Sequence, residues 1–288
     1  MRKFADIQKN GLRAAAFLCV PAAAFALALA LSMTAHAKPT PKSLTYLFGD
    51  SEYHVPNSLV KVMLSPENEE DELNYEAIES FVDKLKKRYD TAGCDRTFTT
   101  ARGETVTIPA EVNIYGYIID RDTEIRYLTK DLRSNVGSRA IRREPVYSQT
   151  GYSRYGADDL FDTYIEVDLT AQHLWYFYDR CENLVESDVV TGCYNKGTVT
   201  PTGAYQILYK QTPARLRGSN SAGSWDVEVS YWMQFYKGFG LHDAAWRSEF
   251  GGDIYMDGGS HGCVNLPWDT ADVLYYSAAK GTPVIVHE

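Results

Sequence analysis

In the second half of the chain, short apolar runs alternate with glycine, proline and other turn residues. Each run has the length of a strand, and turn residues bound it on both sides. Strands of this length, one after another, are typical of an all-β sandwich or barrel-like unit. The predicted strands cover 164–169, 174–178, 184–191, 204–209, 227–235 and 239–242. The polar, Ser/Gly-rich stretch 211–225 is expected to form a loop over a groove.

The spacing of apolar residues changes to a helical period after residue 266. Ala271, Leu274 and Ala278 fall on one face of a helix predicted over 267–280. Pro267 suits the first helical position and Gly281 the position after the last turn. A closing strand is predicted at 284–286. We therefore expect a mainly-β unit over 162–288 with one helix near its end.

The first half mixes helical and strand patterns. A helix is predicted over 74–89, because Ile78, Phe81, Val82 and Leu85 share one face and basic residues gather at its end. The alternation over 105–117 predicts a strand, and 122–135 predicts a second helix that ends at 135–138. The acidic run 67–72 is interpreted as the entry to the first helix. Residues 44–160 are therefore expected to form an α+β domain, with a boundary loop over 147–162.

Residues 1–37 have the pattern of a targeting segment. A basic start precedes an apolar run over 14–31 and the sequence Ala35-His36-Ala37, which resembles a signal cleavage site. The run is also just long enough to span a bilayer, so an uncleaved anchor is the alternative. Either interpretation predicts export of the remaining chain, with residues 38–43 as a linker.

Net charge limits the partners that we expect. The chain carries a net charge of −9, and residues 1–37 hold four basic residues and one acid, a net of +3, which leaves −12 for the rest. An acidic body argues against nucleic acid as a partner. Attraction to an anionic cell wall would have to be local. The 21 tyrosines favour sheets, and most are expected to pack in cores.

A cysteine with histidines near it in the sequence is the strongest chemical signal. Cys263 lies in the glycine-flanked stretch Gly259–Asn265, with His261 two residues before it and His242 further upstream. A thiol at its ordinary pKa is a weak nucleophile at neutral pH, so thiol catalysis needs a base beside it. We predict Cys263 as the nucleophile and His242 as general base and acid.

Other features of the stretch support acyl transfer. The backbone N–H groups of Gly262 and Cys263 are expected to face a developing oxyanion, and Asn265 to brace the loop. His261 is expected to shape the turn or to touch substrate. The thiol also precedes the predicted helix, whose dipole would lower its pKa.

Several alternatives use the same residues. A buried core cysteine is disfavoured by the polar neighbours of Cys263. His242, Asp243, His261 and Cys263 are possible zinc ligands, but the sequence contains no C-x-x-C pair and no H-E-x-x-H helix. Papain-like enzymes place cysteine before histidine, and sortase-like enzymes need an arginine after the cysteine, which this chain lacks.

One motif resembles the signature of the L,D-transpeptidase (YkuD-like) catalytic domain. It consists of His242, 17 intervening residues and then Ser260-His261-Gly262-Cys263-x-Asn265. Residues 164–175, 200–203 and 281–284 resemble its opening strands, a turn and its closing strand. The preceding α+β region resembles the peptidoglycan-binding-like domain of Gram-positive members, although a spacing domain without a ligand is an equal alternative.

The resemblance implies a function. Cys263 would attack a tetrapeptide stem of peptidoglycan, and another stem would capture the acyl-enzyme in a 3→3 cross-link. No cofactor is implied, and carbapenem β-lactams would acylate Cys263. Ser260 would hold the second nitrogen of His242. The substrate grooves would involve Asp243, Tyr231, Trp232, Trp246 and Asn265.

Two other functions fit the same residues. Water as acceptor would make the enzyme an L,D-carboxypeptidase. A catalytically inert wall-binding protein is the non-enzymatic alternative. For the other thiols, a strand separates Cys181 from Cys193 by more than a disulfide can span, so both are expected to be free, and Cys94 is undecided.

Overall fold

The structure is a computed structural model that describes residues 43–66, 72–134, 140–152, 159–160, 163–220 and 223–288. The predicted targeting segment and nearly all of the linker lie outside these residues, as do most of the acidic run and parts of the boundary loop. The predicted end of the second helix, at 135–138, lies outside them too. Within the described ranges, no helix has the length and apolar character that a membrane span requires.

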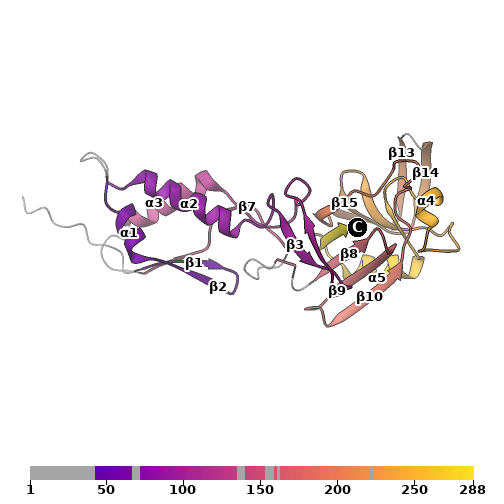
Figure 1. The fold of residues 1–288 in the computed structure, drawn as a ribbon, viewed down its shortest axis with the longest axis horizontal. Coiled ribbons are helices and arrows are strands. Elements are labelled where there is room, and N and C mark those ends of the chain that lie inside the picture. The colour runs from indigo at the N-terminus through magenta and orange to yellow at the C-terminus, as the bar shows by residue number, and fades with distance from the viewer. Residues whose placement is uncertain (1–42, 67–71, 135–139, 153–158, 161–162, 221–222) are drawn as a thin grey trace, which may run out of the picture. The chain divides into compact units, whose positions relative to one another are not determined.

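The N-terminal part combines a small sheet with three helices. Strand β1 (Leu44–Phe48) pairs antiparallel with β2 (Ser51–Val55) and parallel with β6 (Ile141–Arg143). Helices α1 (Asn57–Met63), α2 (Tyr75–Tyr89) and α3 (Arg121–Ser134) accompany it, and α2 lies beside α3 (Figure 1). One apolar cluster joins these elements. Its fully buried members include Leu44, Tyr46, Met63, Ile78, Val82, Leu128 and Leu132.

The two helices predicted here are confirmed. The Asn74 side chain accepts a hydrogen bond from the Ala77 amide at 2.8 Å, which caps α2 at the predicted start. Three basic residues occupy its last turn and complement the helix dipole. Helix α3 lies within one residue of the predicted 122–135. Helix α1 was not predicted, because only Val60 and Met63 of its seven residues are buried.

The strand predicted over 105–117 is wrong beyond Ile108. Strand β4 (Thr105–Ile108) pairs with β3 (Arg96–Thr99), and the chain then turns at Pro109. Proline has no N–H to continue the ladder, and the Pro109 carbonyl accepts hydrogen bonds from the amides of Val112 and Asn113. Farther along, β5 (Ile118–Ile119) pairs with β7 (Tyr147–Gln149).

The C-terminal part is a sandwich of two sheets, as predicted. The order of the first sheet is β10-β9-β8-β18-β11, and that of the second is β12-β15-β16-β17. The strands are β8 (Tyr164–Asp168), β9 (His173–Tyr178), β10 (Asn183–Asp188), β11 (Gly203–Gln206), β18 (Pro283–His287), β12 (Tyr209–Gln211), β15 (Trp232–Tyr236), β16 (Phe239–Asp243) and β17 (Val264–Leu266). Figure 1 shows helix α5 (Trp268–Ser277) beside these strands.

The sandwich core fixes which way the strand carrying His242 faces. Leu241 and Val264 are fully buried in the apolar cluster between the sheets, together with Ile165, Val286 and Leu274. Neighbouring side chains on a strand point to opposite faces. Anchoring Leu241 in the core therefore turns His242 to the other face. A buried leucine is worth roughly 2–5 kcal/mol relative to alanine, so this orientation is strongly held.

Two predictions for the region between these strands are wrong. The expected loop over 211–225 is largely a hairpin of β13 (Ala214–Asn220) and β14 (Gly223–Val229). The single strand expected over 227–235 breaks between Val229 and Trp232 into β14 and β15. The hairpin places Arg215 opposite Glu228 and Arg217 opposite Asp226, and such opposite-charge pairs stabilise antiparallel strands in a polar sequence. Helix α4 (Ile254–Gly258) was not predicted either, and none of its residues is buried.

The β3–β4 hairpin is tied to strand β8 by a buried carboxylate. Glu166 is fully buried and accepts hydrogen bonds from the Ala101 amide at 2.9 and 3.0 Å. The same carboxylate lies 3.1 Å from Nε2 of His287. A third apolar cluster joins Phe98 of the same hairpin to Tyr115 and to Ile285 of strand β18.

The pair of Glu166 and His287 generates a prediction of pH-dependent stability. Burial alone would lower the pKa of His287, but its bonds to Glu166 and to the Glu288 carbonyl raise the pKa overall. The protonated ring is therefore favoured in the fold. Its contribution to stability is complete below the ordinary histidine pKa of about 6.5 and is lost as pH rises through the higher folded value.

We therefore expect His287→Gln to lower Tm most at the acid end of a series from about pH 5.5 to 8.5. The difference between wild type and His287→Gln should shrink toward the alkaline end. A difference in Tm that stays constant across the series would contradict the assignment.

Candidate active site

Backbone contacts hold the Gly259–Cys263 turn in place. The Ser260 amide donates to the Thr191 carbonyl at 2.8 Å, and the Ser260 carbonyl accepts from the Cys193 amide at 2.9 Å. The Thr198 hydroxyl donates to the Ser260 carbonyl, also at 2.9 Å. The turn is thus bound to a segment some 65 residues earlier in the chain, which local sequence patterns do not reveal.

The expected role of Ser260 as a partner of His242 is not what the structure shows. Its hydroxyl donates to the Cys263 carbonyl at 2.5 Å and accepts from the Gly262 amide at 3.0 Å. Ser260 therefore closes the turn on itself. Because the Gly262 N–H is engaged by this hydroxyl, the Cys263 amide remains as the oxyanion donor of the two that we predicted.

Gly262 is required by its backbone angle and by its neighbour. Its φ of +121° lies in a region that side chains rarely adopt, and a Cβ there would lie 2.3 Å from Cε1 of Phe239. Its carbonyl accepts from the Thr200 hydroxyl at 2.9 Å. The glycine thus lets the turn pass close to β16.

Parallel pairing brings the catalytic candidates together. In the ladder between β16 and β17, His242 is the register partner of Asn265 and Leu241 that of Val264. Asn265 therefore shares a face with His242, and Cys263 comes two residues before Asn265. His242 and Cys263 line one cavity of about 680 Å³. Its other described lining residues include Tyr209, Arg215, Leu216, Arg217, Trp225, Trp232, Gln234, Trp246, Arg247, Ser260, His261 and Asn265.

A chain of hydrogen bonds sets the tautomer of His242. Nε of Arg247 donates to Oδ1 of Asn265 at 2.9 Å, and an arginine nitrogen can only donate. The Asn265 amide therefore turns Nδ2 toward Nε2 of His242, at 3.0 Å. Nε2 must then accept, which leaves the proton on Nδ1, where it is donated to the Asp243 carbonyl at 2.8 Å. The basic lone pair of the imidazole is therefore on Nε2, where it accepts the hydrogen bond from Asn265.

Burial makes both reacting groups neutral in the resting site. It lowers the pKa of His242, and the nearby Arg247 charge acts in the same direction against the opposing effect of Asp243. Burial raises the pKa of Cys263 to about 11, opposed by a hydrogen bond from the Gly240 backbone. The predicted lowering of the thiol pKa by a helix is therefore wrong. Helix α5 begins at Trp268, and strand β17 separates it from Cys263.

Two tryptophans flank the imidazole of His242. The rings of Trp232 and Trp246 each lie 5.9 Å from it, centroid to centroid. Trp232 is buried and donates from Nε1 to the Tyr209 hydroxyl at 3.1 Å, whereas Trp246 is 53% exposed. Trp246 thus presents an aromatic surface to solvent at the cavity, where a substrate can reach it.

Two residues predicted to contact substrate do not line this cavity. The Asp243 carboxylate accepts a hydrogen bond from the Tyr231 amide at 2.7 Å, and both residues are buried. The Tyr231 hydroxyl donates to Asp272 of helix α5. Asp243 follows the cavity residue His242 on β16, so alternation turns it to the opposite face, and Tyr231 directly precedes the cavity residue Trp232 at the start of β15. The prediction for Asp243 and Tyr231 is therefore corrected: only the Asp243 carbonyl reaches the site, through His242.

His261 lies beneath the β13–β14 hairpin. The Trp225 ring stacks on it with centroids 4.5 Å apart and planes at 28°. Burial lowers the pKa of His261, and Lys196 adds to the effect. The ring thus supports the hairpin over the cavity. Neither Trp225 nor Arg247 was predicted, although Arg247 lies in the short loop that follows the strand-end histidine.

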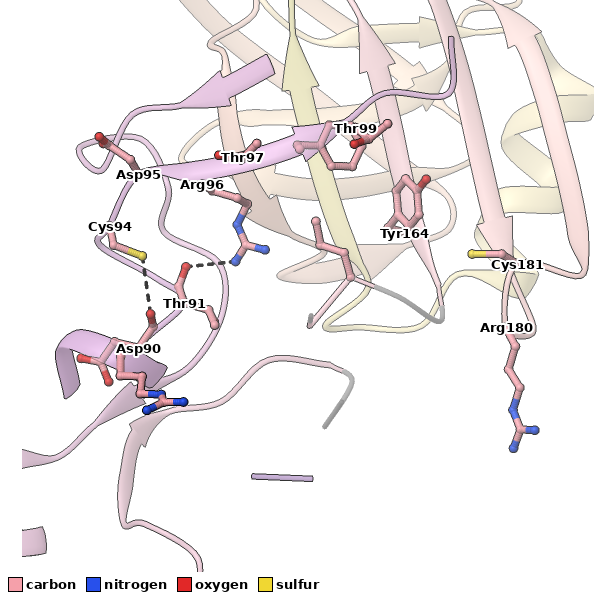
Figure 2. Close-up of a pocket in the computed structure, with 13 residues that line it drawn as sticks. Asp90, Thr91, Cys94, Asp95, Arg96, Thr97, Thr99, Tyr164, Arg180 and Cys181 are labelled. Carbon is pink, nitrogen blue, oxygen red and sulfur yellow. Dashed lines mark hydrogen bonds between the residues drawn. The ribbon is translucent and has the colours of Figure 1, made fainter. Parts of the chain in front are cut away.

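A second cavity, of about 670 Å³, lacks the groups for acyl transfer (Figure 2). Cys94 and Cys181 line it, but none of its described lining residues is a histidine. Burial raises the pKa of Cys94, whose Sγ lies 3.5 Å from the Asp90 carbonyl. The thiol of Cys193 is buried elsewhere, and no disulfide joins it to Cys181.

The zinc alternative gains no geometric support. In the described part of the chain, no three His, Cys, Asp or Glu side chains are grouped so as to hold a metal ion. Asp243 turns away from Cys263, as described above. The arrangement of His242 and Cys263 instead suits proton transfer from a thiol to an imidazole.

Comparisons with known proteins identify what the chain is similar to. The model of the YkuD family, the L,D-transpeptidase catalytic domain, matches residues 162–286. A crystal structure of a mutant L,D-transpeptidase from Enterococcus faecium is 32% identical, with a TM-score of 0.72. The match covers 85% of this chain and 95% of that one. The Ldtfm–avibactam carbamoyl enzyme is also 32% identical, with a TM-score of 0.73, over 85% and 93% of the two chains.

No curated protein matches the chain. The E. faecium structure nevertheless matches along most of both chains, so the likeness extends well beyond the residues of the catalytic domain. At this identity and coverage, together with the match to the catalytic domain, the chain belongs to the L,D-transpeptidase family.

Proposed function

We propose that this protein is an exported peptidoglycan L,D-transpeptidase that forms 3→3 cross-links through an acyl-enzyme on Cys263. The observation that carries the proposal is the shared cavity of Cys263 and His242, in a chain of this family. The imidazole has its lone pair on Nε2, and the thiol is protonated at neutral pH. A neutral pair of this kind needs general-base catalysis to generate the nucleophile.

In acylation, the thiol proton passes through His242 to the leaving amine, and a C–S bond replaces the C–N bond of the donor stem. Nε2 of His242 takes the thiol proton while Sγ of Cys263 attacks the carbonyl carbon between the third and fourth residues of a donor stem. The Asn265 amide, which now donates to Nε2, gives up that hydrogen bond as the thiol proton arrives. The Cys263 amide stabilises the oxyanion. The C–N bond then breaks, and Nε2 returns the proton to the leaving amine of the D-residue.

Deacylation reverses these roles with a new acceptor. The side-chain amine of a second stem attacks the thioester carbonyl carbon, and Nε2 of His242 removes a proton from that amine. The C–S bond then breaks as the new C–N bond is completed, and Nε2 returns the proton to Sγ, which restores the thiol. If water attacks instead, the product is a tripeptide, and the enzyme is an L,D-carboxypeptidase. The exposed Trp246 and the open cavity provide room for an acceptor stem.

The remaining parts of the chain suit work at the cell wall. The basic and apolar pattern of residues 1–37 supports export, by a cleaved signal or by a retained anchor. We further propose that residues 44–160 form the domain that approaches peptidoglycan, which would bring an acidic protein to its anionic substrate through local contacts. Binding of purified peptidoglycan by this region tests that role.

The assignment of the nucleophile is tested by covalent labelling. We expect intact-mass spectrometry to show one carbapenem adduct per chain in the wild type and none in Cys263→Ala. Cys94→Ala is the matched control, because Cys94 is an exposed thiol in the other cavity, and it should retain the adduct. An adduct on Cys263→Ala would refute the assignment.

The nature of the acceptor is tested with defined substrates. Purified tetrapeptide stems should yield cross-linked dimers in excess over tripeptides, as separated by mass spectrometry. Cys263→Ala run in parallel should yield neither product. A yield of tripeptides without dimers would contradict the transpeptidase activity and indicate an L,D-carboxypeptidase.

The pH profile tests the state of His242. Because burial lowers the pKa of His242, the ring stays neutral and able to accept a proton below the ordinary value of about 6.5. We expect the midpoint of the acid limb of the pH profile of kcat/KM for acylation to lie below about pH 6.5. Above that midpoint, kcat/KM should rise toward neutral pH. An acid limb above about pH 7 would show that the imidazole is not held neutral as described.

A further inference from the structure

Arg247 carries an unneutralised charge in the active-site cavity. It lines the cavity and is partly buried, and burial lowers its pKa. Among the described residues, no carboxylate forms an ion pair with it. A partly buried cation without a counter-ion is unfavourable, because hydrogen bonds to neutral groups replace only part of its lost hydration. The cavity therefore holds a positive charge that an anionic ligand would neutralise.

The other two arginines of the cavity differ from Arg247. Asp226 binds Arg215 through two bonds, at 2.6 and 3.0 Å, and also accepts from Nε of Arg217 at 3.1 Å. Alternation along the hairpin turns these two side chains away from Leu216 and Trp225, which pack toward Cys263 and His261, although both arginines are among the residues that line the cavity. No Asp or Glu appears among the described residues that line the cavity. Of the three arginines that line it, Arg247 is thus the one without a carboxylate partner in the described part of the chain.

Two existing hydrogen bonds determine which edge of the guanidinium is available. Nε donates to Oδ1 of Asn265, and Nη2 donates to the Gly258 carbonyl, both at 2.9 Å. These bonds occupy the side edge of the planar group. The opposite edge, formed by Nη1 and the second N–H of Nη2, makes no hydrogen bond within the described part of the chain. Two parallel N–H groups of this kind match the two oxygens of a carboxylate.

Asn265 connects Arg247 to the imidazole that would protonate the departing amine, and all three residues line one cavity. The same amide binds Arg247 through Oδ1 and Nε2 of His242 through Nδ2. In the proposed reaction His242 protonates the amine of the departing D-residue. The α-carboxylate of that residue is attached to the same carbon atom as the amine. A donor whose amine lies at His242 therefore carries its carboxylate in the cavity that Arg247 also lines.

We propose that Arg247 binds the terminal carboxylate of the donor stem and so selects donors that end in a free D-residue. This inference rests on the proposed function and deepens it. Arg247 has a second role as a positioning residue, since it orients Asn265 and through it His242. The two roles make different predictions, because positioning of His242 serves every donor and carboxylate binding serves only anionic ones.

The experiment compares two donors, a tetrapeptide stem with a free C-terminal carboxylate and the same stem as its C-terminal amide. Acylation of Cys263 is followed by intact-mass spectrometry, and the ratio of kcat/KM for the two donors is the readout. We expect the wild type to prefer the free acid. Arg247→Gln should reduce that preference by about 10- to 100-fold, the range expected for a charge-assisted hydrogen bond. Arg247→Lys should retain part of it, since lysine keeps the charge but not the fork.

Arg142→Gln is the matched control. It removes one positive charge from a surface ion pair with Glu52 and should leave the ratio unchanged. A ratio that stays at the wild-type value in Arg247→Gln, even if both rates fall, would assign Arg247 to positioning alone and overturn the proposal. If the wild type forms no Cys263-linked acyl-enzyme from either donor, the proposed function itself fails, so the two failures are distinguishable.

Discussion

The parallel pairing of β16 with β17 is the constraint on which the active site depends. It sets Leu241 beside Val264 in the core and His242 beside Asn265 on the opposite face. A shift by one residue would exchange these faces, burying a histidine and an asparagine among aliphatic side chains. The apolar residues of the core therefore hold His242 and Asn265 in register, although the apolar side chains do not themselves line the cavity.

In the resulting site, the Cys263 thiol and the His242 imidazole are both neutral before reaction. Burial raises the pKa of the Cys263 thiol and lowers that of His242, so neither group carries a charge when the site is empty. In contrast, Arg247 keeps its charge and has no carboxylate partner in the described structure. Among the described lining residues, the positive charge without a carboxylate partner is thus that of Arg247, which does not transfer protons. This arrangement leaves substrate recognition and proton transfer to different side chains, connected through Asn265.

The turn around Cys263 shows how a site can be supported by distant segments. Ser260 is bound by the backbone of Thr191 and Cys193, and Gly262 by the hydroxyl of Thr200. Each of these hydrogen bonds involves at least one main-chain atom. Any residue type provides a main-chain carbonyl, so the positions that contribute one can vary in residue type. Glycine at 262 is the exception, because its φ and the nearby Phe239 ring exclude a side chain. The position of the thiol consequently depends on how the two segments fold together.

The sequence by itself determined most of the element types and selected His242 and Cys263 as the candidate reacting pair. Periodicity revealed α2, α3, α5 and most strands, and the spacing of His242 and Cys263 pointed to a thiol acyltransferase. These features are local, or depend on residue type, and can be recognised without coordinates. The β13–β14 hairpin escaped prediction because its Ser/Gly-rich tip suggested a loop, although Leu216, Trp225 and Val227 alternate with charged residues on the strands either side of it.

Only the tertiary structure decided the partners and protonation states of these residues. Strand faces and burial account for three findings that the sequence did not predict. Ser260 closes its own turn, Tyr231 and the Asp243 carboxylate face away from the cavity, and the pKa of the Cys263 thiol is raised. Each depends on packing between segments far apart in the chain, whose register and desolvation cannot be derived from neighbours in sequence. The link from Arg247 through Asn265 to His242 exists for the same reason, because β-sheet pairing brings together a loop and two strands.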